Sequence, residues 1–365
     1  MPERHDVAVV GLGVIGAACA AMIAETGARV IAFDRFEPPH DSGSSHGETR
    51  IFRIAYAEGA QYAPLAQRAL ALWRALEADA PGSLLRQTGL IYAGAPDGPL
   101  LHGVRHSAQT HGLALRPAEP AEISFATSSS WDVIVEPDAG YLRAEACVAG
   151  LMAKARQNGA ALHLNAQARF ERADRGFKVN DGAHDFYADR LVLCVGGWLA
   201  AYLNNAAGVA LRRHSLHWFA HDDAMAFTPF IAALHDASWI YALPGEDGAS
   251  VKVANHFGGQ ALAAPEERDA VDAMAILQSF QPEVRALMPD IGAHRQSKNC
   301  LYTMTPDEDF LIGPYPNDDA MFIAGGMSGH GFKFAPAIGE LAAQWMTGDE
   351  TVIDPAMFSP SRLFT

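Results

Sequence analysis

The sequence predicts an α/β protein with two domains, one of which binds a nucleotide in the Rossmann manner. At 365 residues the chain exceeds the usual size of a single domain. Near its start, Gly11, Gly13 and Gly16 follow an apolar run of strand length. Further strand-like runs recur through the middle of the chain, so we expect a second domain rich in β-structure.

The first element is a predicted βαβ unit. Residues 6–10 are apolar after Asp6 and of strand length, and residues 17–28 carry Ala, Met and Ile at helical intervals. The helix is expected to end at Gly27, and residues 29–34 form a second strand that closes on Asp34. A glycine motif between a strand and a helix is specific enough to predict a dinucleotide site.

Each residue of the motif has an expected role in this site. Gly11 permits the tight turn, Gly13 lets a pyrophosphate approach the backbone, and Gly16 allows the helix to pack closely on the strand. The helix N-terminus supplies unpaired N–H groups and a positive dipole. Asp34 would accept from a ribose hydroxyl, which makes NADP the least favoured cofactor but leaves NAD and FAD open, with an empty glycine turn as the remaining alternative. The expected contacts here are Gly11, Gly13, Val14, Ile15, Gly16, Asp34 and Arg35.

The elements that follow are predicted from the same signals. Residues 41–59 are too polar and too rich in small residues for a core element, so we expect a loop that holds the cofactor. Residues 61–82 predict an amphipathic helix that ends at Pro81 and Gly82. The expected β-structure comprises strands in 86–94 and 161–174, a hairpin with an Asp-Gly turn in 177–189, and a buried strand entering a turn in 190–200.

Composition narrows the class of ligand. The chain is 49% hydrophobic and 19% charged, which is typical of an ordinary globular protein. A net charge of -15 and a pI near 5.4 argue against nucleic-acid and anionic-membrane partners. We therefore expect a small-molecule substrate.

Targeting and cysteine signals are few. There is no run of eighteen apolar residues, and the N-terminal apolar run contains glycines where a signal peptide would be leucine-rich, so we expect a cytoplasmic protein. The cysteines lie far apart and form no CxxC pair, which predicts neither a disulfide framework nor a metal site. They are Cys19, Cys147, Cys194 and Cys300.

Three longer motifs carry a family resemblance. They are DSGSSHGETRIFRIAYAEG at 41–59, KNCLYTMTPDEDFLIG at 298–313 and SGHGFKF beginning at Ser328. With them the chain resembles the monomeric sarcosine oxidase and N-methyltryptophan oxidase group of the D-amino-acid oxidase superfamily. Residues 90–240 match only loosely, and Ile54 stands where this group often has His.

The resemblance implies a discontinuous architecture. An FAD-binding domain would comprise residues 1–88, 145–210 and 297–365, and a substrate domain with a large mixed β-sheet would comprise 89–144 and 211–296. Members of this family are monomeric, so the resemblance also implies a monomer.

The implied activity is oxidation of a small secondary (N-methyl) amino acid such as sarcosine. Hydride would pass from the amine carbon to the flavin N5, O₂ would be reduced to H₂O₂, and the imine would hydrolyse to an aldehyde and an amine. The alternatives are a flavin-dependent amine dehydrogenase, an oxidase of primary or cyclic amino acids, an NAD dehydrogenase and a flavin-binding scaffold without activity. The collected charges of Arg50, Arg53, Lys252 and Lys333 argue against the scaffold.

Cys300 aligns with the family cysteine that is joined to the flavin through a thioether. Covalent FAD is thus implied. A thiolate is the competent nucleophile for that attachment, and nearby Lys298 could help to ionise it. The alternative is a buried structural cysteine.

The resemblance assigns four residues to catalysis. Lys252 lies in an alternating strand pattern where a charge must be buried, liganded or facing a cavity, and by resemblance it faces the flavin ring. There it would stabilise the negative charge that develops on oxygen. Arg50 would modulate flavin and oxygen chemistry, His256 would lie near the substrate amine on the face of Lys252, and His46 would orient the flavin. A lysine pointing to solvent from an edge strand is the alternative for Lys252.

The substrate carboxylate is assigned to two cations. Arg53 offers a bidentate fork and Lys333 a point charge. Tyr241 and Tyr302 are expected to line the same cavity, with Gly329 beside them. For Arg50 and Arg53, the alternative is pairing with surface carboxylates such as Glu48 or Glu58.

The last motif is expected to hold the flavin edge on which charge builds during reduction. Backbone N–H groups of the turn at Gly329, His330 and Gly331 would meet that edge, and a helix over 332–346 would point its N-terminus there. A structural turn that caps the helix is equally compatible. The remaining expected cofactor contacts are Ser44, Ser45, His46, Arg50, Gly197, Cys300, Gly329, Gly331, Phe332 and Lys333.

Overall fold

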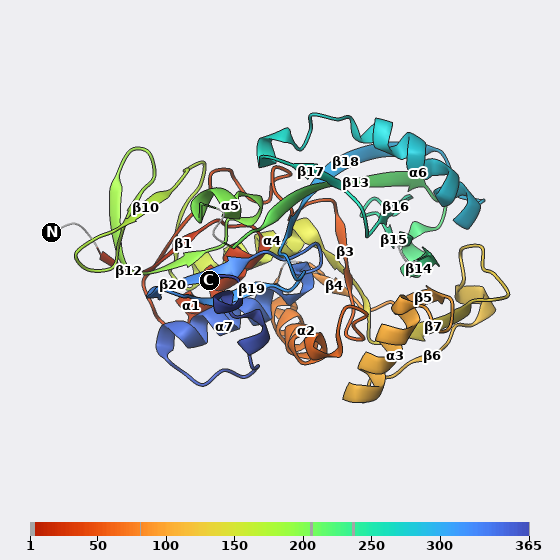
Figure 1. The fold of residues 1–365 in the computed structure, drawn as a ribbon, viewed down its shortest axis with the longest axis horizontal. Coiled ribbons are helices and arrows are strands. Elements are labelled where there is room, and N and C mark those ends of the chain that lie inside the picture. Colours follow the sequence, from red (N-terminus) through yellow and green to blue (C-terminus); the bar gives the residue numbers. More distant parts are fainter. Residues whose placement is uncertain (1–3, 81, 205–206, 236–237, 365) are drawn as a thin grey trace.

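The computed structural model describes residues 4–80, 82–204, 207–235 and 238–364, and it has the mixed α/β architecture expected from the sequence (Figure 1). Within these ranges the strands form three sheets, of eight, nine and three strands. Among the helices in these ranges, none has the length and the hydropathy that crossing a membrane requires.

The eight-stranded sheet contains the predicted βαβ unit. β1 pairs in parallel with β2 and β12, and the order along the sheet is β10-β11-β12-β1-β2-β9, with β20 beside β12 and β19 beside β20. The predicted hairpin is β11–β12, but β12 continues as one strand through the segment expected to be separate, because Arg190–Leu193 stays paired with β1. The bounds are β1 Arg4–Val10, β2 Val30–Phe33, β9 Ala161–His163, β10 Arg169–Arg172, β11 Phe177–Asn180, β12 Asp185–Leu193, β19 Leu311–Tyr315 and β20 Asp318–Gly325.

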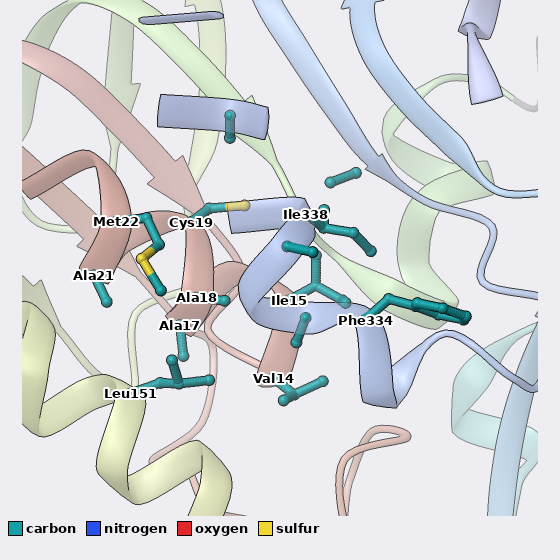
Figure 2. Close-up of a cluster of buried hydrophobic side chains, with 14 of the residues drawn as sticks. Val14, Ile15, Ala17, Ala18, Cys19, Ala21, Met22, Leu151, Phe334 and Ile338 are labelled. Atoms are coloured by element: carbon teal, nitrogen blue, oxygen red, sulfur yellow. The ribbon is translucent and has the colours of Figure 1, made fainter. Parts of the chain in front are cut away.

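Helix α1 (Val14–Glu25) is buried along almost its whole length, since two other helices pack against it (Figure 2). These are α4 (Ala144–Gln157), which contributes Leu151, and α7 (Ala335–Thr347). A Cβ at Gly339 of α7 would lie 2.6 Å from the Ala18 carbonyl oxygen. The small residues of α1 therefore permit close helix contacts that fix its N-terminus at the glycine turn.

The nine-stranded sheet is the predicted large mixed sheet. Its order is β17-β13-β16-β15-β14-β5-β7-β6, with β18 along β13; β14 and β5 are parallel, and the other pairs are antiparallel. Helices α3 and α6 accompany it, and the predicted domain boundary at 296/297 falls inside β18. The bounds are β5 Leu90–Gly94, β6 Arg116–Pro117, β7 Asp132–Glu136, β13 Ala210–Ala220, β14 Phe230–His235, β15 Ser238–Pro244, β16 Ser250–Asn255, β17 Gln260–Leu262, β18 His294–Met304, α3 Pro99–His111 and α6 Ala273–Leu287.

The small sheet joins the two larger parts and corrects one expectation. Residues 41–48 form the expected loop, but β3 (Thr49–Phe52) pairs with β8 (Gly140–Arg143), which also pairs with β4 (Leu85–Arg86). The chain then enters the core at Phe52 and Tyr56. The loop prediction was therefore wrong for Thr49–Phe52, which pair with β8, and right for residues 53–59, which belong to no helix or strand.

The remaining helices connect these layers. The predicted amphipathic helix is α2 (Ala63–Ala78); Pro81 of its expected stop lies outside the described residues. The other helices are α5 Leu199–Tyr202 and the 3-10 turns η1 Ala60–Tyr62, η2 Pro120–Glu122, η3 Gly196–Trp198, η4 Ala224–Ala226, η5 Pro265–Glu267, η6 Phe332–Phe334, η7 Ala356–Phe358 and η8 Pro360–Arg362.

Candidate active site

One cavity extends from the glycine turn of the βαβ unit to the inner face of the nine-stranded sheet. It brings together most of the residues proposed from the sequence. Those on its wall are Gly11, Gly13, Val14, Ile15, Asp34, Arg35, Ser44, Ser45, Arg50, Arg53, Gly197, Tyr241, His256, Cys300, Tyr302, Gly329, Gly331, Phe332 and Lys333. Gly16, His46 and Lys252 are not part of this wall.

The glycine turn has the geometry that a dinucleotide requires. Gly11 has a φ of +92°, and a Cβ there would clash with the Cys194 carbonyl. A Cβ at Gly16 would clash with the Gly11 carbonyl, which explains why Gly16 packs helix on turn and is absent from the cavity wall. Helix α1 has no acidic residue in its first turn, so its N-terminus is free to favour an anionic pyrophosphate.

Asp34 lies at the end of β2 and is partly engaged already. Its Oδ2 accepts from the Leu12 N–H at 2.7 Å, and its Oδ1 accepts from the Phe36 N–H at 2.8 Å. Each carboxylate oxygen has a further lone pair, so a ribose hydroxyl can still donate to it. Arg35 next to it forms an ion pair with Glu266 at 3.2 Å.

Cys300 is a buried free thiol on β18, and the cation beside it differs from the expected one. Arg50 Nη2 lies 3.9 Å from Cys300 Sγ and donates to the Ser44 carbonyl at 3.0 Å. Lys298 is exposed and borders a second, polar cavity. The cation that the structure places beside the thiol is therefore Arg50, while Lys298 borders a different cavity.

Lys252 is buried, with 1% of its surface exposed, so the solvent-facing alternative is excluded. Its Nζ donates to the Gly47 carbonyl at 2.8 Å and to the Thr49 carbonyl. The ammonium thus ends on the backbone of the 47–49 segment instead of on the cavity wall where the resemblance suggested it. Burial lowers the pKa of Lys252 well below its ordinary value, and the nearby Arg50 lowers it further.

His46 is also buried, and its ring faces away from the main cavity. It borders the second cavity with Arg268, Asp269 and Lys298. Neither ring nitrogen has a hydrogen-bond partner in the described residues. Burial lowers the pKa of His46 to about 3, with Arg50 as the next cause, so the ring is neutral at ordinary pH. Its backbone carbonyl accepts from Arg50, which leaves the carbonyl, not the imidazole, in contact with the cavity's residues.

Arg53 and Lys333 converge on Tyr56. The Arg53 Cζ lies 4.0 Å from the Tyr56 ring centroid, and the Lys333 Nζ lies 2.9 Å from the Tyr56 hydroxyl. Arg53 Nη2 donates to Glu58, at 2.6 Å from Oε2, while Arg53 Nη1 has no partner in the described residues. Burial alone would raise the pKa of Glu58, but the Arg53 charge and hydrogen bond, together with the nearby His330 and His256, outweigh burial and hold that pKa below its ordinary value. Arg53 therefore pairs with Glu58, which was the alternative expected from the sequence. The pair lies inside the protein instead of on its surface, and Arg53 Nη1 is left as a donor for a ligand.

Glu136 and Tyr92 support Arg53 from behind and were missed by the sequence reasoning. Glu136 Oε1 accepts from the N–H groups of Ile54 at 2.7 Å and Ala55 at 3.0 Å, and Oε2 accepts from the Tyr92 hydroxyl at 2.6 Å. Burial raises the pKa of Glu136. A carboxylate at the end of the apolar strand DVIVE was the available signal, but its partner segment lies far away in the sequence.

The sheet face opposite carries His256 and several aromatic residues. His256 lies just past β16, and its Nε2 is 3.8 Å from Glu58. Burial lowers the pKa of His256 to about 4. Trp239, two positions before Tyr241 on β15, also lines the cavity and stacks on His256 with centroids 6.0 Å apart. The alternation along β15 was the signal that could have identified Trp239.

The turn before α7 supplies the remaining wall. Gly329 has a φ of +82°, and a Cβ there would clash with the Tyr302 ring. The helix expected from 332 begins with the 3-10 turn η6, and α7 itself begins at Ala335. Tyr302 stacks on His214 with centroids 3.8 Å apart, which holds that ring against the turn.

The described residues contain neither a disulfide nor a candidate metal site. All four cysteines are free, and within the described ranges no group of His, Cys, Asp and Glu residues is arranged to hold a metal ion.

Known proteins resemble the chain over nearly its whole length. N-methyl-L-tryptophan oxidase of Citrobacter koseri is 32% identical over 371 residues, which cover 98% of this chain and 99% of the relative. The solved structure of NikD, an unusual amino acid oxidase essential for nikkomycin biosynthesis, has a TM-score of 0.86 at 20% identity and covers 98% of each chain. L-proline dehydrogenase from P. horikoshii has a TM-score of 0.83 at 19% identity, covering 99% of this chain and 98% of its own.

The two structural likenesses support the fold, and the family rests on the sequence matches. The model of the family described as FAD dependent oxidoreductase matches residues 6–345, a range that contains the glycine turn, Cys300 and Lys333. The chain therefore belongs to the FAD-dependent oxidoreductase family.

Proposed function

We propose that this FAD-dependent oxidoreductase is an oxidase of a small N-methyl amino acid such as sarcosine. The observation that carries the proposal is the convergence of Arg53 and Lys333 on Tyr56 at the wall of the cavity that also contains the glycine turn. Glu58 compensates the charge of Arg53, whereas Lys333 donates to the Tyr56 hydroxyl and the His330 carbonyl, so an anion that binds between Arg53 and Lys333 would compensate the second buried charge. An amino-acid carboxylate fits that need.

Arg53 and Lys333 each keep a donor for such a ligand. Arg53 Nη1 has no partner in the described residues, and Lys333 uses two of its three hydrogens on the Tyr56 hydroxyl and the His330 carbonyl. Together they would fix the carboxylate by charge-assisted hydrogen bonds. Fixing one end of the substrate orients the other end in the cavity.

His256 would receive the amine. Its neutral imidazole can accept a hydrogen bond from the substrate nitrogen, and Glu58 beside it compensates positive charge there. Trp239 and Tyr241 would form an apolar and aromatic surface around the N-methyl group. FAD, when bound, supplies the two-electron acceptor for the hydride of the amine carbon.

The proposal includes oxygen as the final acceptor and attachment of FAD through Cys300. Lys252 and Arg50 would provide positive charge near the cysteine, where negative charge develops on oxygen. The name of the Citrobacter koseri relative supports N-methyl amino acids as the substrate class. Sarcosine is our proposed example of that class, because its N-methyl group would contact the aromatic side chains on the sheet face of the cavity.

A peroxide-coupled screen of the holoenzyme tests the proposal. The panel contains sarcosine, N-methyltryptophan, other N-methyl amino acids, pipecolate, proline and primary amino acids. We expect peroxide with N-methyl amino acids and little with primary ones. Anaerobic bleaching of the flavin without aerobic peroxide would indicate a dehydrogenase, and preference for primary or cyclic amino acids would assign the alternative substrate class.

A further inference from the structure

Glu136 is a buried carboxylate that the proposed function has not used. It is the last residue of β7, with 1% of its surface exposed. Its Oε1 accepts from the backbone N–H groups of Ile54 and Ala55, and its Oε2 accepts from the Tyr92 hydroxyl. Ile54 directly follows Arg53 in the chain, so this carboxylate lies behind a residue that is proposed to bind the substrate carboxylate.

The contacts of Glu136 favour its ionised form. Two of them come from backbone N–H groups, which can only donate. The Tyr92 hydroxyl lies 2.6 Å from Glu136 Oε2 and 3.2 Å from its other acceptor, the Ala55 carbonyl, so the hydrogen of Tyr92 is better placed for the carboxylate. Burial raises the pKa of Glu136, and the Tyr92 hydrogen bond, the two N–H groups and the charge of Arg53 oppose that rise.

Glu136 differs from Glu58 in what it leaves free. Glu58 accepts from Arg53 and so occupies one of its nitrogens. In the part of the chain that the structure describes, Glu136 forms no hydrogen bond or ion pair with Arg53 or Lys333. Its charge nevertheless acts there, because burial and Arg53 lower the pKa of Lys333 while Glu58 and Glu136 oppose this. Glu136 thus reduces the positive potential of the site without taking a donor from a ligand.

A charge that acts without contact distinguishes ligands by their net charge. A small monoanion that binds between Arg53 and Lys333 is repelled by Glu136. In a zwitterionic amino acid the ammonium group is attracted while the carboxylate is repelled, so the two effects largely cancel. The hydrogen bonds from Arg53 and Lys333 are the same for both ligands, since each presents a carboxylate. Glu136 therefore weakens one class of ligand more than the other.

We propose that Glu136 is a specificity-determining residue, which disfavours simple monoanions at the Arg53 and Lys333 site and so favours zwitterionic amino acids. The inference rests on the proposed function, in which these two cations bind the substrate carboxylate. It adds a residue that acts on the ligand through its charge and does not touch it. Without this charge, small anions would compete more strongly with an amino acid for the two cations.

The test compares propanoate with glycine, which have nearly the same shape and differ in the ammonium group. Each is mixed with the holoenzyme in the absence of oxygen, and the initial change in the flavin spectrum reports binding. Glu136→Gln keeps an acceptor oxygen for Ile54 and Ala55 and removes the charge. A unit charge at about 10 Å changes an equilibrium roughly tenfold in a protein site, so propanoate should bind more tightly by about that factor. The affinity for glycine should change little.

Two further variants separate the charge of Glu136 from its structural contacts. Glu145→Gln is the matched control, because Glu145 also accepts from two backbone N–H groups, those of Gly47 and Glu48, but its charge acts on Lys252. It should leave the affinities for propanoate and glycine unchanged. Glu136→Asp keeps the charge and should retain the wild-type ratio of the two affinities.

Tyr92→Phe tests the same role if Glu136→Gln does not fold. It keeps Glu136 but removes a hydrogen bond that favours the charged form, so Glu136 should take up a proton at a higher pH than in the wild type. As the pH falls, propanoate binding should strengthen relative to glycine binding, and it should do so at a higher pH than in the wild type. The other ionisable groups nearby, Glu58, His256 and His330, are present in both proteins, so the comparison removes their contribution.

The outcomes distinguish this inference from the proposed function. If propanoate does not bind the wild type, or binds Lys333→Met as tightly as the wild type, the carboxylate site itself is wrong. If propanoate binds through Lys333 but Glu136→Gln leaves its affinity unchanged, or changes the affinity for glycine equally, the role of Glu136 is overturned. Propanoate binding without glycine binding, or the same pH dependence in Tyr92→Phe as in the wild type, would also overturn it.

Discussion

The two pairs of cations in the site differ in the groups that compensate them. Arg53 and Lys333 lie beside carboxylates, with Glu58 hydrogen-bonded to Arg53 and Glu136 behind it. Arg50 and Lys252 donate to backbone carbonyls instead. Those carbonyls belong to Ser44, His46, Gly47 and Thr49.

The difference shows how one protein prepares cations for two kinds of task. Carboxylates neutralise the Arg53 end, which allows two cations to be buried together while unused donors remain for a ligand. Carbonyl groups satisfy the hydrogen-bonding capacity of Arg50 and Lys252 without cancelling their charge, and because carbonyls only accept, they oppose the lowering of the Lys252 pKa by burial and by Arg50. Arg50 and Lys252 are therefore suited to stabilising negative charge that develops during a reaction, and Arg53 and Lys333 are suited to binding a ligand that is already negatively charged.

The largest expected effect concerns Cys300 at the Arg50 end. If the charge of Arg50, 3.9 Å from the thiol, supports thiolate formation, FAD becomes attached through Cys300. Acid precipitation of the wild type should leave yellow flavin in the pellet, and Cys300→Ser should release all of it. Cys147→Ser, at a buried cysteine outside the cavity, is the control that should keep the colour. Flavin wholly in the wild-type supernatant would show that the attachment is absent.

Lys252 gives the next largest effect. Removal of one preorganised group that stabilises developing charge costs about a hundredfold to a thousandfold in rate, so Lys252→Met should slow reaction of the reduced enzyme with oxygen by that factor. Anaerobic reduction by substrate should change much less. Stopped-flow measurement times the two half-reactions separately.

The control for Lys252 is a lysine on the surface. Lys178→Met removes a partly exposed lysine that pairs with Asp185 and should leave both half-reactions unchanged. If Lys252→Met slowed reduction and reoxidation equally, the lysine would be assigned to support of the 47–49 backbone, and the contrast between the two cation pairs would lose its functional meaning.

Lys252 also shows what the sequence could and could not reveal. Its burial follows from the alternating pattern of β16, because a charge among inward-facing apolar residues has no route to solvent. Its carbonyl partners could not be predicted, since Gly47 and Thr49 reach it only through the folding of a segment far away in the chain. The same holds for Cys300, because Arg50, which lies 3.9 Å from its sulfur, comes from a segment far away in the chain.

The fold was predicted best where signals are local. The βαβ unit and α2 follow from periodicity within one segment, and both are present. The course of β3 into the core and the pairing of β13 with β18 depend on contacts between distant segments. Residues such as Glu136 and Trp239 were missed for that reason, because each lies in an ordinary strand and becomes part of the site only by pairing.

Substitution of Arg53 or Lys333 is expected to have a smaller effect than substitution of Lys252. A charge-assisted hydrogen bond contributes about 1.5 to 3 kcal/mol, so Arg53→Ala or Lys333→Ala should weaken acetate binding about ten- to a hundredfold. Acetamide binding and flavin content should change little. Titration of the flavin spectrum measures both ligands. Equal losses for acetate and acetamide would mean that these cations maintain the cavity and do not recognise charge.

The smallest expected effect is a shift in the pKa values of two histidines, one near each pair of cations. Burial lowers the pKa of His46 to about 3, and Arg50 and Lys252 are among the groups that lower it further. Burial also lowers the pKa of His256, to about 4, but there Glu58 raises it. Removing Lys252 with Lys252→Met should therefore raise the pKa of His46, and removing the Glu58 charge with Glu58→Gln should lower that of His256, each by roughly one unit. NMR of the labelled imidazoles measures both values.

The cross-experiment decides whether the contrast is local. Lys252→Met should leave His256 unchanged and Glu58→Gln should leave His46 unchanged, because Glu58 is not among the groups that shift His46 and Lys252 is not among those that shift His256. The sign also fixes the dependence of stability on pH. Both histidines have folded pKa values below the unfolded value, so the unfolded state binds more protons and stability falls as pH decreases from about 6.5 toward the folded values. A higher pKa of His46 should reduce the loss of stability at acid pH, and a lower pKa of His256 should increase that loss. Urea unfolding at a series of acid pH values measures both changes in the free energy of unfolding. Shifts of the same sign at both histidines would mean that one common field acts on the whole cavity, and that the carboxylate-compensated and carbonyl-compensated ends are not electrostatically distinct.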